Sequence, residues 1–297
     1  MIRILLNGKK AALPEVRSAV ATMRREHGPV EVRVTWEHGD CERLVREAAR
    51  DGVSRIVAAG GDGTINEVVN GLAKLERAGR PELAILPLGT ANDFAVACMI
   101  PGQPLDALRL AVTGTSRGVD IVQANERYFI NIATGGFGSQ VTAETSPQLK
   151  NFLGGGAYAL AAVIKSLNFV PSRGRLLAEG VDLRGEAVAA AICNGRQAGG
   201  GQVLAADAYI DDGLLDIMVI LVFPFADVAQ VLVEVKAQSS GKYVKRFRSP
   251  WAESRPEQVR SVNLDGEPYQ AEQIRFDVLP GEIQLVLPPH CPCIKGV

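Results

Sequence analysis

The chain has 297 residues, 47% of them hydrophobic and 22% charged, so its length suggests about two globular domains. Its formal net charge of −1 and its aromatic content of 5% argue against a nucleic-acid-binding surface, which needs basic and stacking side chains. Five cysteines do not make a disulfide framework and indicate a reduced chain.

The first third of the chain alternates apolar runs with amphipathic stretches. The apolar runs predict strands at residues 2–7, 30–36, 55–59 and 83–86. Apolar residues three and four positions apart predict helices that begin near Pro14, Asp40 and Ile65. This order predicts a mostly parallel sheet covered by helices, an α/β domain over residues 1–120.

The remainder of the chain is β-rich. Short β-type runs separated by turn residues predict an antiparallel sandwich or barrel over residues 121–287. The runs lie at 120–124, 128–133, 175–179, 188–193, 214–221, 259–264, 274–278 and 283–287. Two helical segments are expected to interrupt them, around 147–168 and 225–236. Residues 288–297 could return to the first domain.

Neither end of the chain nor its most apolar stretch resembles a targeting or membrane segment. The apolar run at the N-terminus ends at Asn7, too early for a signal peptide. The stretch 214–235 contains Asp216, Pro224 and Asp227, so it fits a strand followed by a helix better than a bilayer span. We therefore expect a cytoplasmic protein without a transmembrane segment.

A glycine-rich loop, Gly60-Gly61-Asp62-Gly63-Thr64, joins the third predicted strand to a helix. Glycines bring backbone N–H groups close to a ligand, and the N-terminus of the helix attracts an anion, so the loop predicts a phosphate site. A plain tight turn explains only part of this pattern. The loop lacks the P-loop sequence, and Asn66 replaces the last glycine of a dinucleotide-binding fingerprint, which disfavours a dehydrogenase.

Two further motifs contain polar residues in loops. The segment PLGTANDFA at residues 87–95 follows the fourth strand, so it should lie beside the glycine loop at the carboxyl edge of the sheet. Its Asn92 and Asp93 are also typical helix caps. Leu264-Asp265-Gly266-Glu267 places two acids two positions apart, and by itself it is most simply a solvated β-turn.

In this order and spacing, the three motifs resemble those of the diacylglycerol kinase catalytic family, and the chain resembles its YegS-like lipid kinases almost end to end. The stretches that carry the resemblance are GGDGTINEVVNGL, PLGTANDFA, LDGE, VRVTW, FINIATGGFG, NGRQAGGGQ and DGLL. The resemblance implies a three-layer nucleotide-binding α/β domain, a C-terminal β-sandwich and an active-site cleft between them. It implies a phosphotransferase that moves the γ-phosphate of ATP to a hydroxyl of a membrane lipid, such as phosphatidylglycerol or diacylglycerol.

The resemblance also assigns roles by position. Glu267 would be the catalytic residue. Independently of the resemblance, the place of Asp62 in the glycine loop suggests that it organises a catalytic Mg²⁺ through water, because like charge keeps it from touching phosphate directly. The nucleotide would contact Thr35, Gly61, Asp62, Gly63, Thr64, Ile65, Asn66, Glu67 and Thr90. Mg²⁺, or Ca²⁺ in its place, would bind the Asp212 carboxylate and the backbone carbonyls of Tyr209 and Leu214. The adjacent Asp211 leaves the choice of acid open.

Two other functions remain open: an NAD kinase-type enzyme with the same loop chemistry, and a catalytically weak nucleotide- or lipid-binding regulator. The segment 87–95 and the C-terminal half count against the first, and retention of Asp62 and Glu267 counts against the second. A lipid acceptor implies transient contact with a membrane surface. The sequence leaves the identity of the lipid and the presence of a homodimer undecided.

Two further features of the sequence are less specific. Residues 236–250 contain five basic residues and no acid, so they could dock on anionic headgroups or form a solvated basic strand. Cys291-Pro292-Cys293 is too short and too solitary for a zinc site, which usually has four ligands, so we expect free thiols.

Overall fold

The computed structural model describes residues 1–136 and 171–296. Its N-terminal part contains a parallel sheet in the order β2-β1-β3-β4. The strands are β1 (Ile2–Asn7), β2 (Val30–Thr35), β3 (Arg55–Gly60) and β4 (Glu82–Pro87). The helices are α1 (Pro14–His27), α2 (Asp40–Arg50), α3 (Asp62–Ala73), α4 (Asp93–Ala97) and α5 (Pro104–Thr113). The predicted α/β domain is confirmed, although the pattern did not indicate α5.

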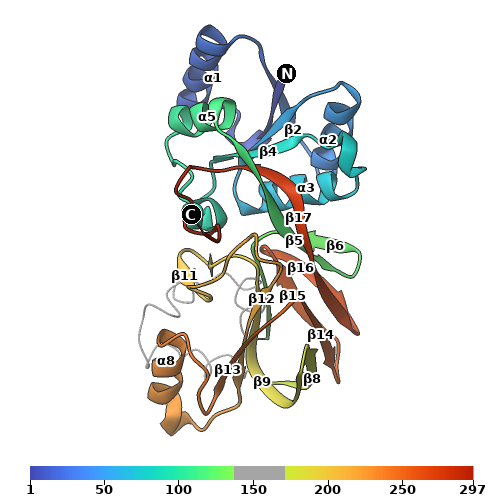
Figure 1. Ribbon diagram of the computed structural model, residues 1–297, viewed down its shortest axis with the longest axis vertical. Helices are drawn as coiled ribbons and strands as arrows, with labels where there is room; N and C mark the ends of the chain where they lie inside the picture. Colours follow the sequence, from blue (N-terminus) through green and yellow to red (C-terminus); the bar gives the residue numbers. More distant parts are fainter. Residues whose placement is uncertain (137–170, 297) are drawn as a thin grey trace.

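Helices cover both faces of this sheet, with α1 and α5 on one side and α2 and α3 on the other (Figure 1). The alternation of side chains along β1 explains the two layers. Ile4 and Leu6 pack in the cluster that contains residues of α1 and α5, whereas Leu5 packs in the cluster that contains residues of α2 and α3. The strands are therefore apolar on both faces, as buried parallel strands are.

The C-terminal part is mainly antiparallel, as predicted. Its strands are β5 (Ser116–Ala124), β6 (Arg127–Phe129), β7 (Ile132–Gly136), β8 (Ser172–Ala178), β9 (Val181–Cys193), β10 (Gln197–Ala198), β11 (Gln202–Val203), β12 (Leu215–Leu221), β13 (Val244–Ser249), β14 (Trp251–Pro256), β15 (Arg260–Leu264), β16 (Glu267–Ala271) and β17 (Ile274–Val286). The helix predicted near 225–236 is present as a 3₁₀ turn followed by α8 (Val228–Lys236). The helix predicted at 147–168 lies outside the described residues.

Strand β17 connects the two parts of the fold (Figure 1). Its 13 residues replace two predicted strands, because the chain continues through a register shift between Leu279 and Ile283 instead of turning back. It pairs antiparallel with β5 and β14, and Leu285 pairs in parallel with Leu83 of β4. One sheet therefore runs through both parts and fixes their relative positions.

The segment after β17 packs against the N-terminal part. Cys291, Cys293 and Ile294 belong to the hydrophobic cluster that also contains residues of α2 and α3. Within the described residues, none of the helices is long and apolar enough to cross a bilayer.

Candidate active site

Two loops meet at the carboxyl edge of the parallel sheet, as their places after β3 and β4 predict. The N–H of Leu88 donates to the carbonyl oxygen of Gly60 at 2.7 Å. A Cβ added to Gly89 would lie 2.6 Å from the Cα of Gly61, so the loops fit together only because these residues are glycines. Asn92 closes the second loop, since its side chain accepts from the N–H of Gly89 at 2.8 Å and donates to its carbonyl at 3.0 Å.

The glycine loop leads directly into α3, whose first N–H groups have no partner within the helix. This end of the helix dipole and the backbone of Gly61 and Gly63 present N–H groups of the kind that bind anions. Thr64 is buried there, and its hydroxyl accepts from the Asn7 side chain at 3.2 Å. Thr35 ends strand β2, which is separated from β3 by β1, and Thr90 is exposed in the second loop.

Three residues assigned to the nucleotide have side chains that face the protein. Ile65 packs in the core with 1% of its surface exposed. The Asn66 amide donates to Asp265 and to the Tyr128 carbonyl, both at 3.1 Å. Glu67 hydrogen-bonds Cys41 and contributes to the raised pKa of that thiol, after burial. The side chains of residues 65–67 therefore contact the protein interior, and only their backbone is left to face a nucleotide.

Asp62 links the glycine loop to α4. Its carboxylate accepts from the backbone N–H groups of Asp93 and Phe94, each at 3.2 Å. Burial raises its pKa, while the two N–H groups oppose that rise. The charge of Asp62 is therefore directed at the start of α4 as well as at the loop.

The buried Asp93 continues this chain of contacts. Its carboxylate accepts from the N–H groups of Gly200 at 2.9 Å and Gly201 at 2.6 Å. The sequence indicated either a polar group at the sheet edge or a helix cap for Asp93, and either a ligand contact or a flexible turn for Gly199-Gly200-Gly201, but no contact between the two. The signal that connects them is chemical: a buried acid needs donors, and consecutive glycines leave backbone N–H groups accessible.

The motif Leu264-Asp265-Gly266-Glu267 forms the turn between β15 and β16. Leu264 pairs with Glu267, and the two turn residues have φ values of 52° and 94°, as a two-residue hairpin of type I′ requires. The expectation of a solvated turn is wrong for Asp265. Its carboxylate accepts from the N–H groups of Ile130, Asn131 and Ile132 at 2.9–3.0 Å, and from the Asn66 amide at 3.1 Å. Burial raises the pKa of Asp265 to about 6, although these four donors oppose the rise.

Glu267 has the opposite surroundings, since it is exposed at the first position of β16. A Cβ added to Gly63 would lie 3.1 Å from Oε1 of Glu267. The C-terminal part of the chain therefore places one solvent-accessible carboxylate directly against the glycine loop. A phosphate held by the loop would lie within reach of this carboxylate.

The segment predicted to hold a metal ion is anchored on β5. Asp120 of β5 accepts from the N–H of Gly213 at 2.7 Å, and its own N–H donates to Ile210. The Asp212 carboxylate has no exposed surface and accepts from Arg248 at 2.5 Å and from the N–H of Leu214 at 3.2 Å. Asp211 instead accepts from the N–H of Lys295 at 2.8 Å, so both acids already have partners within the chain.

The charges around Asp212 fit a cation. Burial raises the pKa of Asp120, and the negative charges of Asp211 and Asp212 raise it further. Arg248 is the cation paired with both Asp212 and Asp216. Carboxylate and carbonyl oxygens are the ligands that Mg²⁺ and Ca²⁺ prefer, so the residues fit the predicted ion, provided that Arg248 releases Asp212.

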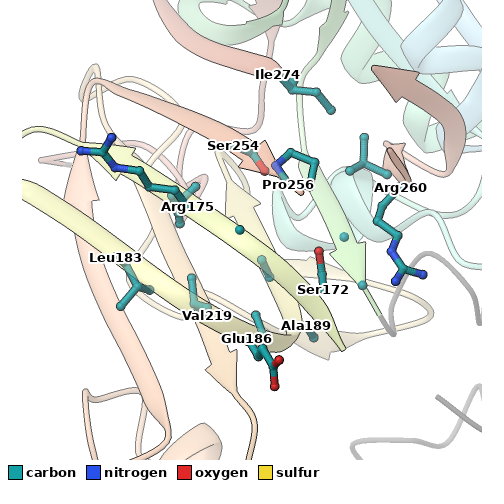
Figure 2. Close-up of a pocket in the computed structure, with 18 of the residues that line it drawn as sticks. Ser172, Arg175, Leu183, Glu186, Ala189, Val219, Ser254, Pro256, Arg260 and Ile274 are labelled. Carbon is teal, nitrogen blue, oxygen red and sulfur yellow. The ribbon is translucent and has the colours of Figure 1, made fainter. Parts of the chain in front are cut away.

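A cavity of about 110 Å³ lies within the C-terminal β-structure (Figure 2). Its walls are mostly aliphatic side chains and glycine backbone, for example Leu183 of β9, Val219 of β12 and Ile274 of β17. Gly135 and Val262, which pair between β7 and β15, also line it. Val262 is two residues, or about 7 Å, from Leu264, the partner of Glu267, so the cavity approaches the strand pair that presents this acid.

The basic stretch at 236–250 is largely occupied by internal contacts. Arg246 donates to the carbonyl of Leu204 at 2.7 Å, and Lys242 pairs with Asp227 at 3.3 Å. With Arg248 on Asp212, these contacts favour the interpretation as a structural strand, which is β13.

Comparisons with known proteins agree with this geometry. Residues 2–124 match the diacylglycerol kinase catalytic domain, and residues 131–287 match the YegS C-terminal NAD kinase beta sandwich-like domain. A protein of Shewanella frigidimarina named "Probable lipid kinase YegS-like" is 48% identical over 99% of this chain and 96% of its own length. A protein of the same name from Chromohalobacter salexigens is 45% identical over 96% and 92%.

A solved structure of a candidate diacylglycerol kinase from Bacillus anthracis has the same fold. It superposes with a TM-score of 0.82 at 26% identity and covers 98% of this chain and 96% of its own. The two matched domains and the sequence identity over nearly the whole length identify the family of this chain. The chain belongs to the diacylglycerol kinase catalytic family, among its YegS-like lipid kinases.

Proposed function

We propose that this protein transfers the γ-phosphate of ATP to a hydroxyl group of a membrane lipid, phosphatidylglycerol, diacylglycerol or a related lipid, with Glu267 as the catalytic residue. The observation that carries the proposal is the contact between the exposed Glu267 carboxylate and Gly63 of the glycine loop. The loop offers backbone N–H groups to phosphate, and the acid faces the position where an acceptor hydroxyl must arrive.

Phosphoryl transfer depends mainly on positioning and on neutralisation of charge, because its transition state is loose. The proton of the hydroxyl leaves late in such a transition state, so an oriented carboxylate suffices as the base despite its low basicity. Glu267 orients the hydroxyl and accepts its proton. Asp62 and Asn92 hold the two loops in place, so the phosphate meets a preorganised backbone.

The cavity supports a lipid acceptor. Aliphatic walls and glycine backbone suit an acyl chain, and one lining residue, Val262, belongs to the strand that pairs with the one that begins at Glu267. A lipid whose chain entered there would hold its hydroxyl end at the acid.

A structural or regulatory divalent ion at the Asp212 segment would be held by that carboxylate and by the Tyr209 and Leu214 carbonyls, and when bound it would hold the segment together. The donor atoms are oxygens, and the segment is fixed by Asp120. Ca²⁺ accepts the same donors with looser geometry.

The direct test is an assay with γ-labelled ATP and mixed lipid vesicles, with and without Mg²⁺. We expect label in a lipid and loss of transfer when a chelator removes the metal. Label in a dinucleotide, with NAD as the acceptor, would support the NAD kinase-type alternative instead. No transfer to either acceptor by protein that binds ATP would support a regulator.

The Glu267→Gln variant tests the assigned residue. General-base assistance of this kind is worth about 10²–10⁴ in rate, so turnover should fall by that factor while ATP binding persists. Glu272→Gln is the matched control, because this exposed acid lies just beyond the other end of β16. ATP binding is measured by fluorescence of Trp36, which is 91% exposed and follows Thr35, in a Trp251→Phe background. Wild-type turnover in Glu267→Gln would remove this residue from the mechanism.

A further inference from the structure

Three cysteines far apart in the sequence meet beneath the second loop. Cys98 follows α4, and Cys291 and Cys293 lie in the segment after β17. Their sulfur atoms all lie within 4.8 Å of one another, and the residues are 0%, 2% and 0% exposed. The expectation that Cys291 and Cys293 are solitary is wrong, because packing of the C-terminal segment brings them to a third thiol.

The spacing of the three sulfurs suits a single bound ion. Metal–thiolate bonds of about 2.3 Å in a trigonal plane place the sulfurs about 4.0 Å apart, so sulfurs that lie within 4.8 Å of one another need to approach by at most about 0.8 Å. The backbone around it is well fixed. Cys293 donates from its thiol to the carbonyl of Ala97 at 3.2 Å, and its carbonyl accepts from the N–H of Ile210 at 2.9 Å.

A positive charge lies beside the three sulfurs. Arg196 is held there by the Pro292 carbonyl at 2.5 Å. Thiols lose their protons when they bind a metal ion, so the three cysteines would bind it as thiolates.

We propose that Cys98, Cys291 and Cys293 bind one thiophilic metal ion, and that monovalent copper fits the donor set better than zinc. Soft thiolates select monovalent copper as well as zinc, but structural zinc almost always takes four ligands. Among residues 1–136 and 171–296, no histidine, carboxylate or further cysteine joins the three sulfurs.

Such an ion would connect the C-terminal segment to α4. The first N–H groups of α4 hold Asp62, and Cys98 follows the last residue of the helix. Metal binding would thus stiffen the element behind the glycine loop without entering the proposed active site. The expected effect is greater thermal stability of the whole chain.

The test is an anaerobic titration of the full-length reduced protein with cuprous ion, delivered by a colorimetric chelator, and separately with Zn²⁺. We expect one equivalent of copper per chain and a rise in Tm of about 5 °C. Cys98→Ala and Cys293→Ala should lose both effects. Cys41→Ala and Cys193→Ala, which remove buried cysteines elsewhere, are the matched controls and should keep them.

X-ray absorption of the copper-loaded wild-type protein is independent of the variants, and should show three sulfur ligands. Copper binding that survives in Cys98→Ala and Cys293→Ala would overturn the site, as would fewer than three sulfurs around the ion. One equivalent of zinc with no copper would overturn the choice of ion. Loss of two thiols in aerated, metal-free protein would show that the triad is a disulfide pair with a spare thiol, and would also overturn the proposal.

Discussion

Asp265 and Glu267 are two positions apart, yet the structure gives them opposite surroundings, and the Asp265→Ala variant tests this difference. The Asp265 carboxylate accepts from the N–H groups of Ile130, Asn131 and Ile132, and from the Asn66 amide of α3. These four residues are at most 6% exposed, so water does not reach their donors freely. The variant removes the acceptor and leaves all four donors in place.

The cost follows from the number of stranded donors. A buried donor that loses its acceptor costs about 1–3 kcal/mol, so four of them could cost about 4–12 kcal/mol. The space left by the carboxylate holds about one water, which satisfies some of the donors, and we expect a loss of about 4–6 kcal/mol. Whole domains are stable by only about 5–15 kcal/mol, so the variant should be close to unfolding at room temperature.

The assay is urea unfolding of the wild type, Asp265→Ala and Asp265→Asn at pH 7.5 and 10 °C, followed by circular dichroism. Asp265→Asn keeps one acceptor oxygen and should lose about half as much free energy of unfolding as Asp265→Ala. Glu267→Gln serves as the control, because an exposed acid outside this network should leave stability within about 0.5 kcal/mol of the wild type. Wild-type stability of Asp265→Ala would refute the reasoning, and so would an equal loss in Glu267→Gln.

Three further outcomes follow from single contacts. Gly89→Ala places a Cβ 2.6 Å from the facing α-carbon of the glycine loop, so ATP affinity, measured by fluorescence titration, should fall at least about tenfold. Gly102→Ala is the control and should keep its ATP affinity, because no atom lies within 4 Å of the added Cβ. Arg248→Met removes the guanidinium that pairs with Asp212. Divalent-ion affinity, measured by calorimetry, should then rise about fivefold, because the ion no longer competes with an ion pair worth about 1 kcal/mol. Weaker binding would contradict this. The pKa of Asp265 is about 6 in the folded chain and about 3.9 when unfolded. Its contribution to stability is therefore present below pH 4 and falls by about 3 kcal/mol as the pH rises through 6. A difference in free energy of unfolding between the wild type and Asp265→Asn that does not change with pH would contradict this.

The fold could be predicted largely from periodicity, and the misses have physical causes. The four parallel strands and their helices follow from apolar spacing, because each element buries a continuous face. The pattern separated β17 into two strands at Pro280-Gly281, which normally mark a turn. In the structure a register shift absorbs this pair, and Gly281 donates its N–H to Asp120 at 2.8 Å. That contact depends on a residue 161 positions away, which local pattern does not contain.

The structure confirms that the two predicted loops lie together, but the sequence did not indicate the directions of several side chains around them. The ends of β3 and β4 place the two loops together, because parallel strands of one sheet end at one edge. Nothing local shows that Asn66 turns away from the glycine loop toward Asp265, or that Asp93 holds Gly200 and Gly201. These directions are set by the buried N–H groups that need acceptors, and the donors become visible only when distant strands are assembled.

The turn at Asp265-Gly266 explains how one short motif serves both stability and chemistry. Two residues apart on a straight strand, both acids would face the same side. Positive φ values at both turn residues reverse the chain between them, so Asp265 points back to the buried N–H groups while Glu267 begins the returning strand beside Gly63. The inward acid also binds Asn66 of α3, the helix that begins at the glycine loop. The position of Glu267 relative to the loop is therefore set by a hydrogen bond one turn along the same helix, and a change at Asn66 should misplace the acid without touching it.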